Sequence, residues 1–484
     1  MKKSIGTNAI LNTIKTAMSV IFPLLTFPYV SKTLDVASLG KYNFAYSLNS
    51  YFLMFAALGI SSYAVREGAA LREDRKLLSE FASQVFTLNM ISMIVSYILM
   101  FLSILFIPQF QTYTAILIIF SIEILFTTLG VEWIYIIYEE YAYITIRRII
   151  FQFISMVLLF LLVKNENDLI IYAGITVFAN VGANIINIIQ MKKYCDIRIT
   201  KKTNFIRHIK PIIIIFASTI AIKIYTSSDT IMLGIFSGDY EVGLYSVGVK
   251  VYNVMKTLLA AIFVVAIPRL SSYVGRKMMR EYNEMLITIF KSLFVLILPT
   301  ITGLIILSDN IILFLSNESY MAASTSLKML SVAILFSIYS SFYNQCVLIP
   351  LKKEKFFLYA TVISAIVNVL MNFYLIPRYG QNGAALTTVM SEAISFLICY
   401  LAGRKSVKMT GLTRNMVTSL CGCLGITVVC LFVKELGFSN NITIITSIIT
   451  SGLIYGMLLS ILKNDLFLIV INKISSLRIN RSST

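Results

Sequence analysis

Six lysines lie within apolar stretches that are long enough to cross a membrane. They are Lys15, Lys223, Lys250, Lys256, Lys291 and Lys328. A charge in hydrocarbon costs roughly 2.5–3.5 kcal/mol on insertion scales, so it persists where it reaches the interface or faces a cavity. Lys291 and Lys328 lie near the ends of their stretches, where the aliphatic stem carries the ammonium group to the surface. The other four predict a wet, positively charged interior suited to an anionic cargo.

Amide and hydroxyl side chains accompany these lysines at helical spacing. One face of the first stretch carries Asn8, Asn12, Lys15, Ser19 and Thr26. A second face, in the eighth stretch, carries Lys250, Asn253, Lys256 and Thr257. The alternative explanation is a seam between helices, held by polar side chains. The lysines favour the wall of a cavity, because a seam gains nothing from an unpaired ammonium group.

Two arginines extend this series of positive charges to the cytoplasmic end of the predicted spans. With a rise of about 1.5 Å per residue, the depth of each charge follows from its place in its span. From the inner mouth outward, the series is Arg66 and Arg269, then Lys15, then Lys223 and Lys256 near the middle, and Lys250 toward the outer side. If these side chains face one cavity, they form a basic ladder, with Asn12 and Asn253 as neighbouring amide ligands.

Four acidic residues also lie within the apolar stretches. They are Glu123 and Glu132 in the fourth, Asp229 in the seventh and Glu392 in the twelfth. The spacing of Glu123 and Glu132 places them on opposite faces of one helix. Each acid either balances a lysine on another helix or carries a coupling H+ or Na+, as carboxylates inside membranes do in secondary transporters. We take Glu123, Asp229 and Glu392 as the candidates for coupling or gating.

Residue patterns for catalysis are lacking. The single histidine, His208, lies in a basic segment where we expect it to be solvated. No histidine and cysteine cluster has the spacing of metal ligands, and no glycine-rich phosphate loop ending in Gly-Lys-Ser/Thr is present. The six cysteines are not paired across outer loops, so we expect no disulfides. The sequence therefore predicts neither an enzyme nor a bound cofactor or metal.

Composition predicts an all-α integral membrane protein. The 484 residues are 58% hydrophobic, and the mean hydropathy is +0.83. About fourteen segments are long enough to span. They lie near 8–30, 43–64, 81–107, 113–137, 148–163, 169–190, 211–235, 244–268, 285–307, 325–350, 356–376, 382–402, 414–433 and 441–462.

The net charge of +18 is explained by topology, and we expect no nucleic-acid partner. Most Lys and Arg residues fall in alternate loops. The loops between them hold only Lys32, Lys41, Lys164, Arg378 and Lys434. By the positive-inside rule both termini lie in the cytoplasm, and the basic loops face anionic lipid headgroups.

Weak internal similarity predicts two lobes of six spans each. One offset carries Gly40-Lys-Tyr42 onto Gly243-Leu-Tyr245 and also Arg66 onto Arg269. Parallel repeats of this kind are a recurrent plan of transporters, with the cargo site between the halves. We predict an N-terminal lobe at 1–195, a basic cytoplasmic linker at 196–210, a C-terminal lobe at 211–403, and two extra spans with a cytoplasmic tail at 404–484.

Four groups of motifs, in order along the chain, support a resemblance to a known family. They are Phe27-Pro-Tyr-Val-Ser-Lys32 with Gly59-Ile-Ser-Ser-Tyr-Ala-Val-Arg-Glu67; Glu132-Trp-Ile-Tyr135 with Glu140 to Arg148; Asp229-Thr-Ile-Met-Leu-Gly234 with Val242-Gly-Leu-Tyr-Ser246 and Ile267-Pro-Arg-Leu-Ser271; and Asn368 through Ile376-Pro-Arg-Tyr-Gly380. With these the chain resembles Wzx-type flippases, the polysaccharide-transporter branch of the multidrug/oligosaccharidyl-lipid/polysaccharide exporter superfamily. Lys32 stands where the family usually has arginine.

The resemblance implies twelve core helices in two lobes, two additional helices, and a polyprenyl-pyrophosphate-linked glycan as cargo. It places the protein in the bacterial cytoplasmic membrane, with other polysaccharide-assembly membrane proteins as partners. We expect alternating access. Arg66, Arg269 and Lys15 would capture the pyrophosphate, and Lys223 and Lys256 would hold it midway. Lys250 would assist its release, and Asp229 is the first candidate for coupling.

Two other functions remain open at this stage. A drug/cation antiporter of the same superfamily would favour a cavity dominated by carboxylates and aromatic rings, whereas the cavity predicted here is basic. A membrane glycan polymerase or ligase would need a large outer loop with catalytic side chains, and the outer loops of this chain are short.

Overall fold

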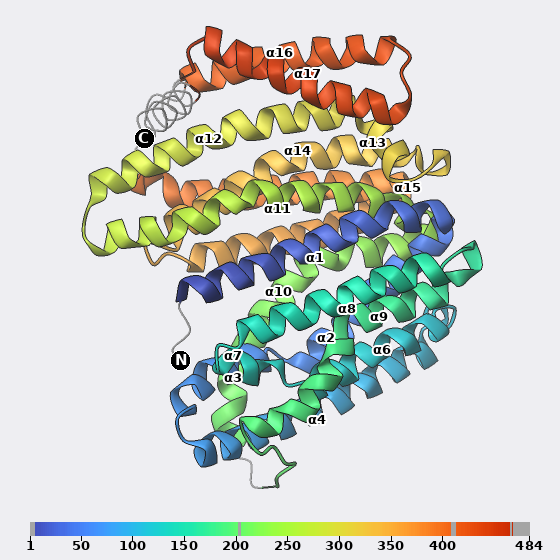
Figure 1. The fold of residues 1–484 in the computed structure, drawn as a ribbon, viewed down its shortest axis with the longest axis vertical. Helices are drawn as coiled ribbons and strands as arrows, with labels where there is room; N and C mark the ends of the chain where they lie inside the picture. Colours follow the sequence, from blue (N-terminus) through green and yellow to red (C-terminus); the bar gives the residue numbers. More distant parts are fainter. Residues whose placement is uncertain (1–4, 202–204, 408–412, 465–466, 468–484) are drawn as a thin grey trace, which may run out of the picture. The chain divides into compact units, whose positions relative to one another are not determined.

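The computed structural model describes residues 5–201, 205–407, 413–464 and 467, and every regular element in these ranges is a helix (Figure 1). Eleven helical segments in the described ranges are long and apolar enough to cross a membrane, and Thr114–Leu129 is a shorter apolar helix at the fourth expected span. One of these segments, Lys355–Ser406, covers two expected spans. The expectation of an all-α integral membrane protein is thereby confirmed.

By their internal contacts, the residues fall into two compact units, Met1–Gly243 and Leu244–Thr484. The first unit contains α1 (Ile5–Thr33), α2 (Val36–Ala57), α3 (Ile60–Gly68), α4 (Arg75–Phe106), α5 (Pro108–Gln111), α6 (Thr114–Leu129), α7 (Glu132–Ile137), α8 (Tyr141–Leu162), α9 (Leu169–Gln190) and α10 (Phe205–Ser237). Short 3-10 turns lie at Ala69–Leu71, Glu166–Asp168 and Met191–Lys193. Within this unit α10 packs on α2 and α3. The lobe boundaries drawn from the repeats remain a prediction.

The second unit begins within α11 (Asp239–Gly275). It continues with α12 (Met279–Ile306), α13 (Ser308–Leu315), α14 (Ala323–Phe342), the π-helical turn η5 (Tyr343–Leu348), α15 (Lys355–Gly403), α16 (Thr413–Glu435) and α17 (Asn440–Ile461). Further 3-10 turns lie at Glu318–Tyr320 and Arg404–Ser406. Gly380, with φ 52° and ψ −132°, interrupts α15 and separates the two expected spans that it contains. Glycine adopts this backbone conformation without the steric penalty that a side chain would bring.

The described surface is inverted relative to that of a soluble protein. Large apolar side chains such as Phe101, Leu424 and Val428 are 64%, 68% and 67% exposed, and many others resemble them. Small hydroxyl and amide side chains are instead buried, as at Asn49, Asn187 and Ser364. Since lipid solvates the apolar exterior, polar side chains are free to connect helices in the interior. The interior is where any polar path must therefore be sought.

The second expected span begins earlier and ends earlier than its sequence suggests. Asp35 caps α2, its carboxylate accepting hydrogen bonds from the amides of Ala37 and Ser38 at 3.2 Å each. The helix ends where Leu58 and Gly59 take positive φ values of 45° and 71°. The expected span of 43–64 therefore becomes the long helix α2 and the separate short helix α3, which carries Arg66.

The two glycines that mark the repeated motif make one reciprocal contact within the first unit. A methyl group at Gly40 would lie 1.7 Å from the Asp239 carbonyl oxygen, and one at Gly243 would lie 2.0 Å from the Val36 carbonyl oxygen. The offset that carries Gly40 onto Gly243 also carries Val36 onto Asp239. The contact is thus isologous, the arrangement that two-fold related surfaces produce. Only glycine permits this approach of backbone to backbone.

The start of the predicted linker is fastened to α4 by a series of hydroxyl groups. The Asp196, Arg198 and Thr200 amides donate to the hydroxyls of Ser79, Ser83 and Thr87 at 3.0, 3.1 and 3.0 Å. Two extended residues advance about 6.6 Å and four helical residues about 6.0 Å, so the two periods match. This part of the linker is a docked strap on the first unit.

His208 contradicts the expectation that it is solvated. Its side chain is only 2% exposed. Nε2 lies 2.7 Å from the Gln84 side-chain oxygen, an acceptor, so Nε2 donates there and Nδ1 accepts from the Tyr63 hydroxyl at 2.7 Å. The prediction was wrong because both partners come from helices distant in sequence. The histidine fastens the first turn of α10 to α3 and α4.

Replacing Gly40 by alanine should destabilise the protein, because the new methyl group would overlap the Asp239 carbonyl oxygen. Overpacking of this kind costs about 1–3 kcal/mol, and backbone on both sides leaves little room to yield. The melting temperature of the detergent-purified protein should fall. Gly174→Ala in α9 is the matched control, since nothing lies within 4 Å of the added group. Equal melting temperatures for the two variants would contradict the reciprocal contact.

Candidate functional site

Of the residues predicted to capture cargo, two can be placed. Arg66 is exposed near the end of α3, where its Nε lies 2.9 Å from a Glu67 carboxylate oxygen. Arg269 is exposed in the second half of α11. Asn12 and Lys15 lie in α1, but their side chains fall outside the part of the chain that the structure describes.

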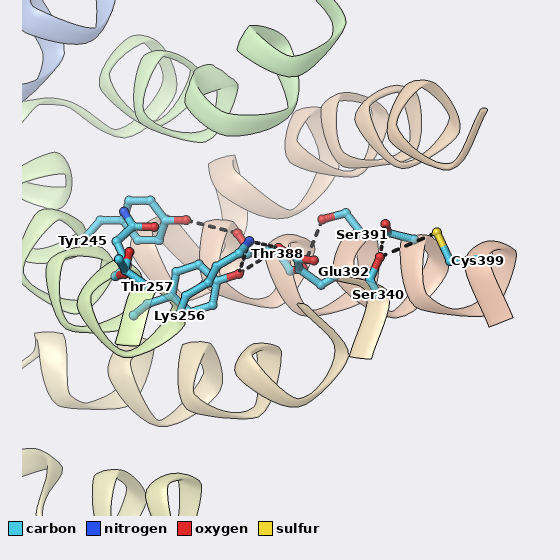
Figure 2. A network of polar contacts seen from close by, with 11 residues as sticks. Tyr245, Lys256, Thr257, Ser340, Thr388, Ser391, Glu392 and Cys399 are labelled. Atoms are coloured by element: carbon cyan, nitrogen blue, oxygen red, sulfur yellow. Dashed lines mark hydrogen bonds and ion pairs between the residues drawn. The ribbon is translucent and has the colours of Figure 1, made fainter. Parts of the chain in front are cut away.

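In the second unit, two predicted site residues meet. Lys256 Nζ on α11 lies 2.9 Å from Glu392 Oε1 on α15, and Figure 2 shows the two side chains directed at one another. The Tyr252 hydroxyl donates to the same oxygen at 2.7 Å. Glu392 is only 6% exposed at its side chain, against 32% for Lys256. A lysine and an acid predicted separately thus form one hydrogen-bonded ion pair, with a tyrosine as the third member.

The rest of the polar stripe in the eighth expected span does not converge on this pair. Asn253 is exposed, and its backbone carbonyl accepts the Thr257 hydroxyl at 2.8 Å. Lys250 is half-buried, a turn and a half before Lys256 on the same helix. Beside the pair, the Tyr245 and Thr388 hydroxyls lie 3.1 Å apart and tie α11 to α15 (Figure 2).

In the first unit, Lys223 contacts a tyrosine of a neighbouring helix. Lys223 Nζ lies 5.8 Å from the centre of the Tyr51 ring, within the range of a cation–π interaction. The Tyr51 hydroxyl donates to the Lys223 backbone carbonyl at 3.3 Å. Tyr51 of α2 therefore contacts Lys223 of α10 through both its ring and its hydroxyl group. Asp229 lies six residues after Lys223 on α10 and is half-buried.

Glu123 is held by amides. It is 3% exposed on α6, and the Nδ2 group of Asn180 on α9 donates to its Oε1 at 2.5 Å. Asn49 on α2 lies with its Nδ2 3.5 Å from Oε2. No lysine or arginine forms an ion pair with Glu123 among the described residues. Of the two roles that the sequence left open for the acids, Glu392 balances a lysine, and Glu123 does not.

Two adjacent arginines that were not among the predicted site residues lie on α8 of the same unit, Arg147 and Arg148. Arg147 is 6% exposed, stacks 5.1 Å from the Tyr143 ring centre and lies 3.5 Å from Glu132.

Glu132 also requires a correction. The expectation placed it inside the fourth span on the face opposite Glu123. In the structure α6 ends at Leu129, the chain turns at Gly130 and Val131, and Glu132 begins the separate helix α7. Val131 takes a positive φ of 36°, which a pattern of apolar residues does not reveal. Glu132 is therefore the counter-charge of Arg147.

The side chains described above are of types that bind anions and exchange protons. Among the described residues, no group of three or more His, Cys, Asp or Glu side chains is placed to hold a metal ion. The interior of the described part of the chain contains cations, amides and tyrosine hydroxyls. Such groups can receive a phosphate or a sugar hydroxyl, and carboxylates beside them can take or release a proton.

Removing the Lys256 ammonium while Glu392 stays should lower stability strongly, because the buried carboxylate would lose its charge partner. Breaking a buried pair in this way costs roughly 3–5 kcal/mol. We expect a lower melting temperature for Lys256→Met and partial recovery in the double variant with Glu392→Gln. Lys328→Met is the control, since its 3.7 Å pair with Asp309 is well exposed and should contribute little. A double variant no more stable than Lys256→Met would argue against the pairing.

Comparison with known proteins agrees with this architecture. Residues 5–274 match the family described as "Polysaccharide biosynthesis protein", and residues 214–374 match the MatE family. The Escherichia coli (strain K12) protein named "Putative O-antigen transporter" is 24% identical over 84% of this chain and 98% of its own length. The lipid II flippase MurJ in an inward closed conformation has a similar fold, with a TM-score of 0.78 at 18% identity, covering 94% of this chain and 99% of that one.

An inward-facing multidrug resistance transporter of the MATE family is a more distant structural match. Its TM-score is 0.53 at 12% identity, over 80% of this chain and 98% of its own. The first family match covers more than half of the chain and includes most of its first unit. The resemblance inferred from the motifs is confirmed, and the chain belongs to the polysaccharide biosynthesis protein family of the exporter superfamily.

Proposed function

We propose that this multi-pass membrane protein moves polyprenyl-pyrophosphate-linked oligosaccharide units from the inner to the outer leaflet of a bacterial cytoplasmic membrane. The observation that carries the proposal is the match to the protein named "Putative O-antigen transporter" along nearly the whole of that relative, in a chain whose helices carry the half-buried lysines Lys223 and Lys256. A glycan cannot cross hydrocarbon unaided, and its pyrophosphate is a dense anion. Amides, hydroxyls and cations lining one route would solvate both.

Alternating access supplies the cycle. Arg66, Arg269 and Lys15 would draw the pyrophosphate to the cytoplasmic mouth while the polyprenyl tail stays in lipid. Lys223 would hold it midway, and Lys250 would assist release. We place both termini in the cytoplasm, membrane lipids around the bundle, and other polysaccharide-assembly membrane proteins beside it. No catalytic step, cofactor or nucleic acid has a place in this cycle.

Lys256 would bind the cargo only when its ion pair with Glu392 is broken. Their 2.9 Å pair makes Glu392 a competitor of any phosphate for the same ammonium group. Protonation of Glu392 would free Lys256 for the cargo, and release of that proton would restore the pair. Glu392 is thus a candidate for coupling to H+, as are Glu123 and Asp229 to H+ or Na+. Transport would then draw on an ion gradient.

A drug/cation antiporter is the second candidate, and the structure offers it less support. Within the described ranges, Lys223 is a half-buried cation without an ion pair to a carboxylate, and a cationic drug would avoid it. A glycan polymerase has less support still, because the described outer segments are short turns between helices.

Lys223→Ala should slow flipping at least tenfold in proteoliposomes loaded with a fluorescent polyprenyl-pyrophosphate oligosaccharide. The reason is that a charge-assisted contact to phosphate contributes about 1.5–3 kcal/mol. Flipping is measured as the fraction of label that a membrane-impermeant quencher reaches over time. Lys164→Ala is the control, because Lys164 is exposed beyond the end of α8 and should leave the rate unchanged.

The outcomes of this assay separate the function from the mechanism. Flipping by the wild type that persists in Lys223→Ala keeps the function and removes Lys223 from the path. A wild type that flips none of several glycans but exports a cationic dye would replace the proposed function with drug export.

A further inference from the structure

The middle of α2 exposes a tyrosine on a polar face. Tyr46 is 37% exposed, and Asn43, Ser47 and Ser50 follow the same face at helical spacing, each half-buried. No aliphatic side chain of α2 is exposed, whereas α4 exposes a row of apolar side chains such as Phe101, as a helix that meets lipid does. Polar groups that neighbouring helices leave uncovered are costly in hydrocarbon. This face of α2 therefore meets water or cargo.

Two other rings of the first unit hold the Tyr46 ring in place. Phe120 of α6 meets it edge-on, with the ring centres 5.3 Å apart and the ring planes at 70°. Tyr42, one turn earlier on α2, lies parallel to it with ring centres 6.0 Å apart. A ring packed in this way has little freedom to rotate. The exposed part of Tyr46 is thus a rigid aromatic surface, which offers contact area at a low cost in conformational entropy.

The amide of Asn180 lies beside the Tyr46 hydroxyl, and a carboxylate fixes its orientation. Asn180 of α9 is exposed, and its Nδ2 donates to Glu123 Oε1 at 2.5 Å and lies 3.5 Å from the Tyr46 hydroxyl oxygen. Because a carboxylate accepts hydrogen bonds, the NH2 group faces Glu123 and the amide oxygen points elsewhere. Within the described residues, no group donates to that amide oxygen, and none accepts the Tyr46 hydroxyl proton. An acceptor and a donor are therefore open beside one aromatic surface.

The second unit indicates which of these residues the packing of the repeat requires. Both units contain a hydrogen bond between a tyrosine and a threonine, formed by Tyr42 and Thr176 in the first and by Tyr245 and Thr388 in the second. The sequence offsets between these two pairs carry Tyr46 onto Val249 and Asn180 onto Glu392. The second unit thus packs without an aromatic ring and an amide at these places. Their presence in the first unit alone favours a ligand over a structural contact.

A sugar ring fits this combination of groups. One side of a pyranose is lined by C–H groups, whose weak positive charge suits the negative face of an aromatic ring. Sugar hydroxyls both donate and accept, so one can donate to the Asn180 oxygen while another accepts from Tyr46. Glu123, the charged member of the cluster, is 3% exposed, and amides meet its oxygens. The surface offered to a ligand is therefore neutral, as a sugar is.

We propose that Tyr46 and Asn180 bind a sugar ring of the lipid-linked glycan, Tyr46 by stacking and both residues by hydrogen bonds to its hydroxyls. The inference rests on the proposed function and adds a specificity site to it. Glu123 positions the Asn180 amide, and Phe120 and Tyr42 position the tyrosine ring. This site recognises the glycan itself, a task distinct from holding the pyrophosphate.

The test compares lipids that differ only in the sugar, bound to the full-length protein in lipid nanodiscs. The probes are farnesyl pyrophosphate and its conjugates with glucose, galactose and N-acetylglucosamine. Wild type should bind at least one conjugate about tenfold more tightly than the sugar-free probe, the gain expected from two hydrogen bonds and a ring contact. Isothermal titration calorimetry measures each affinity.

Substitutions of the tyrosine carry the test. Tyr46→Leu should abolish the preference for the conjugate and leave the affinity for farnesyl pyrophosphate unchanged, because it removes a ring and a hydroxyl but no charge. Tyr46→Phe keeps the ring and should retain part of the preference. Tyr240→Leu is the matched control, since Tyr240 is a 50% exposed tyrosine of the same unit, at the start of α11. Asn180→Ala should also weaken the preference. It removes a partner of Glu123 as well, so the Tyr46 variants decide if that protein does not fold.

Two results would overturn the assignment. One is a sugar preference that survives in Tyr46→Leu, and the other is a wild type that binds all four probes equally. A wild type that flips the oligosaccharide lipid but gives either result keeps the proposed function without this site. A protein that flips none of the glycans, yet shows a preference that Tyr46→Leu abolishes, keeps the site and rejects flipping.

Discussion

A charge placed inside a membrane must find a partner, and the choice of partner organises this protein. Lys256 and Glu392 satisfy each other, and Arg147 is satisfied by Glu132. Glu123 is stabilised by neutral amides, which offset desolvation without cancelling the charge. A paired charge holds helices together. A charge that is stabilised only by neutral dipoles can still be neutralised by an ion, a proton or a substrate.

Each unit contains the same tyrosine–threonine contact, with different polar residues around it. The Tyr42 hydroxyl bonds Thr176 at 3.0 Å in the first unit, and Tyr245 bonds Thr388 at 3.1 Å in the second. One turn after each threonine comes the polar residue at the centre of its unit. In the first unit this is the amide of Asn180, which serves Glu123 on another helix, and in the second it is the carboxylate of Glu392 itself. The tyrosine–threonine contact is thus common to the two units, while the acid lies on a different helix in each.

More of the fold than of the candidate site could be predicted from the sequence. Apolar length and loop charge predict the helices, because the bilayer imposes one length and one backbone solution on every span. The sequence did not predict the turn at Leu58 and Gly59, because a positive φ value leaves no signal in a hydropathy profile. Lys256 and Glu392 were each recognised as out of place in hydrocarbon, but their pairing joins helices far apart in sequence. His208 was misjudged for the same reason, because Gln84 and Tyr63 supply its burial.

Charge balance constrains which residues a pyrophosphate can use. A doubly charged diester entering the second unit meets an ammonium group that Glu392 already neutralises, so contact with Lys256 adds little attraction until that acid is protonated. In the first unit, the described partners of Glu123 are neutral amides, so this carboxylate keeps a charge that would repel an arriving anion. In the proposed cycle, the carboxylate of each unit would set how strongly the nearby cations hold the cargo. A transporter must bind its cargo and then release it, and a carboxylate that gains and loses a proton supplies both states with the same set of cations.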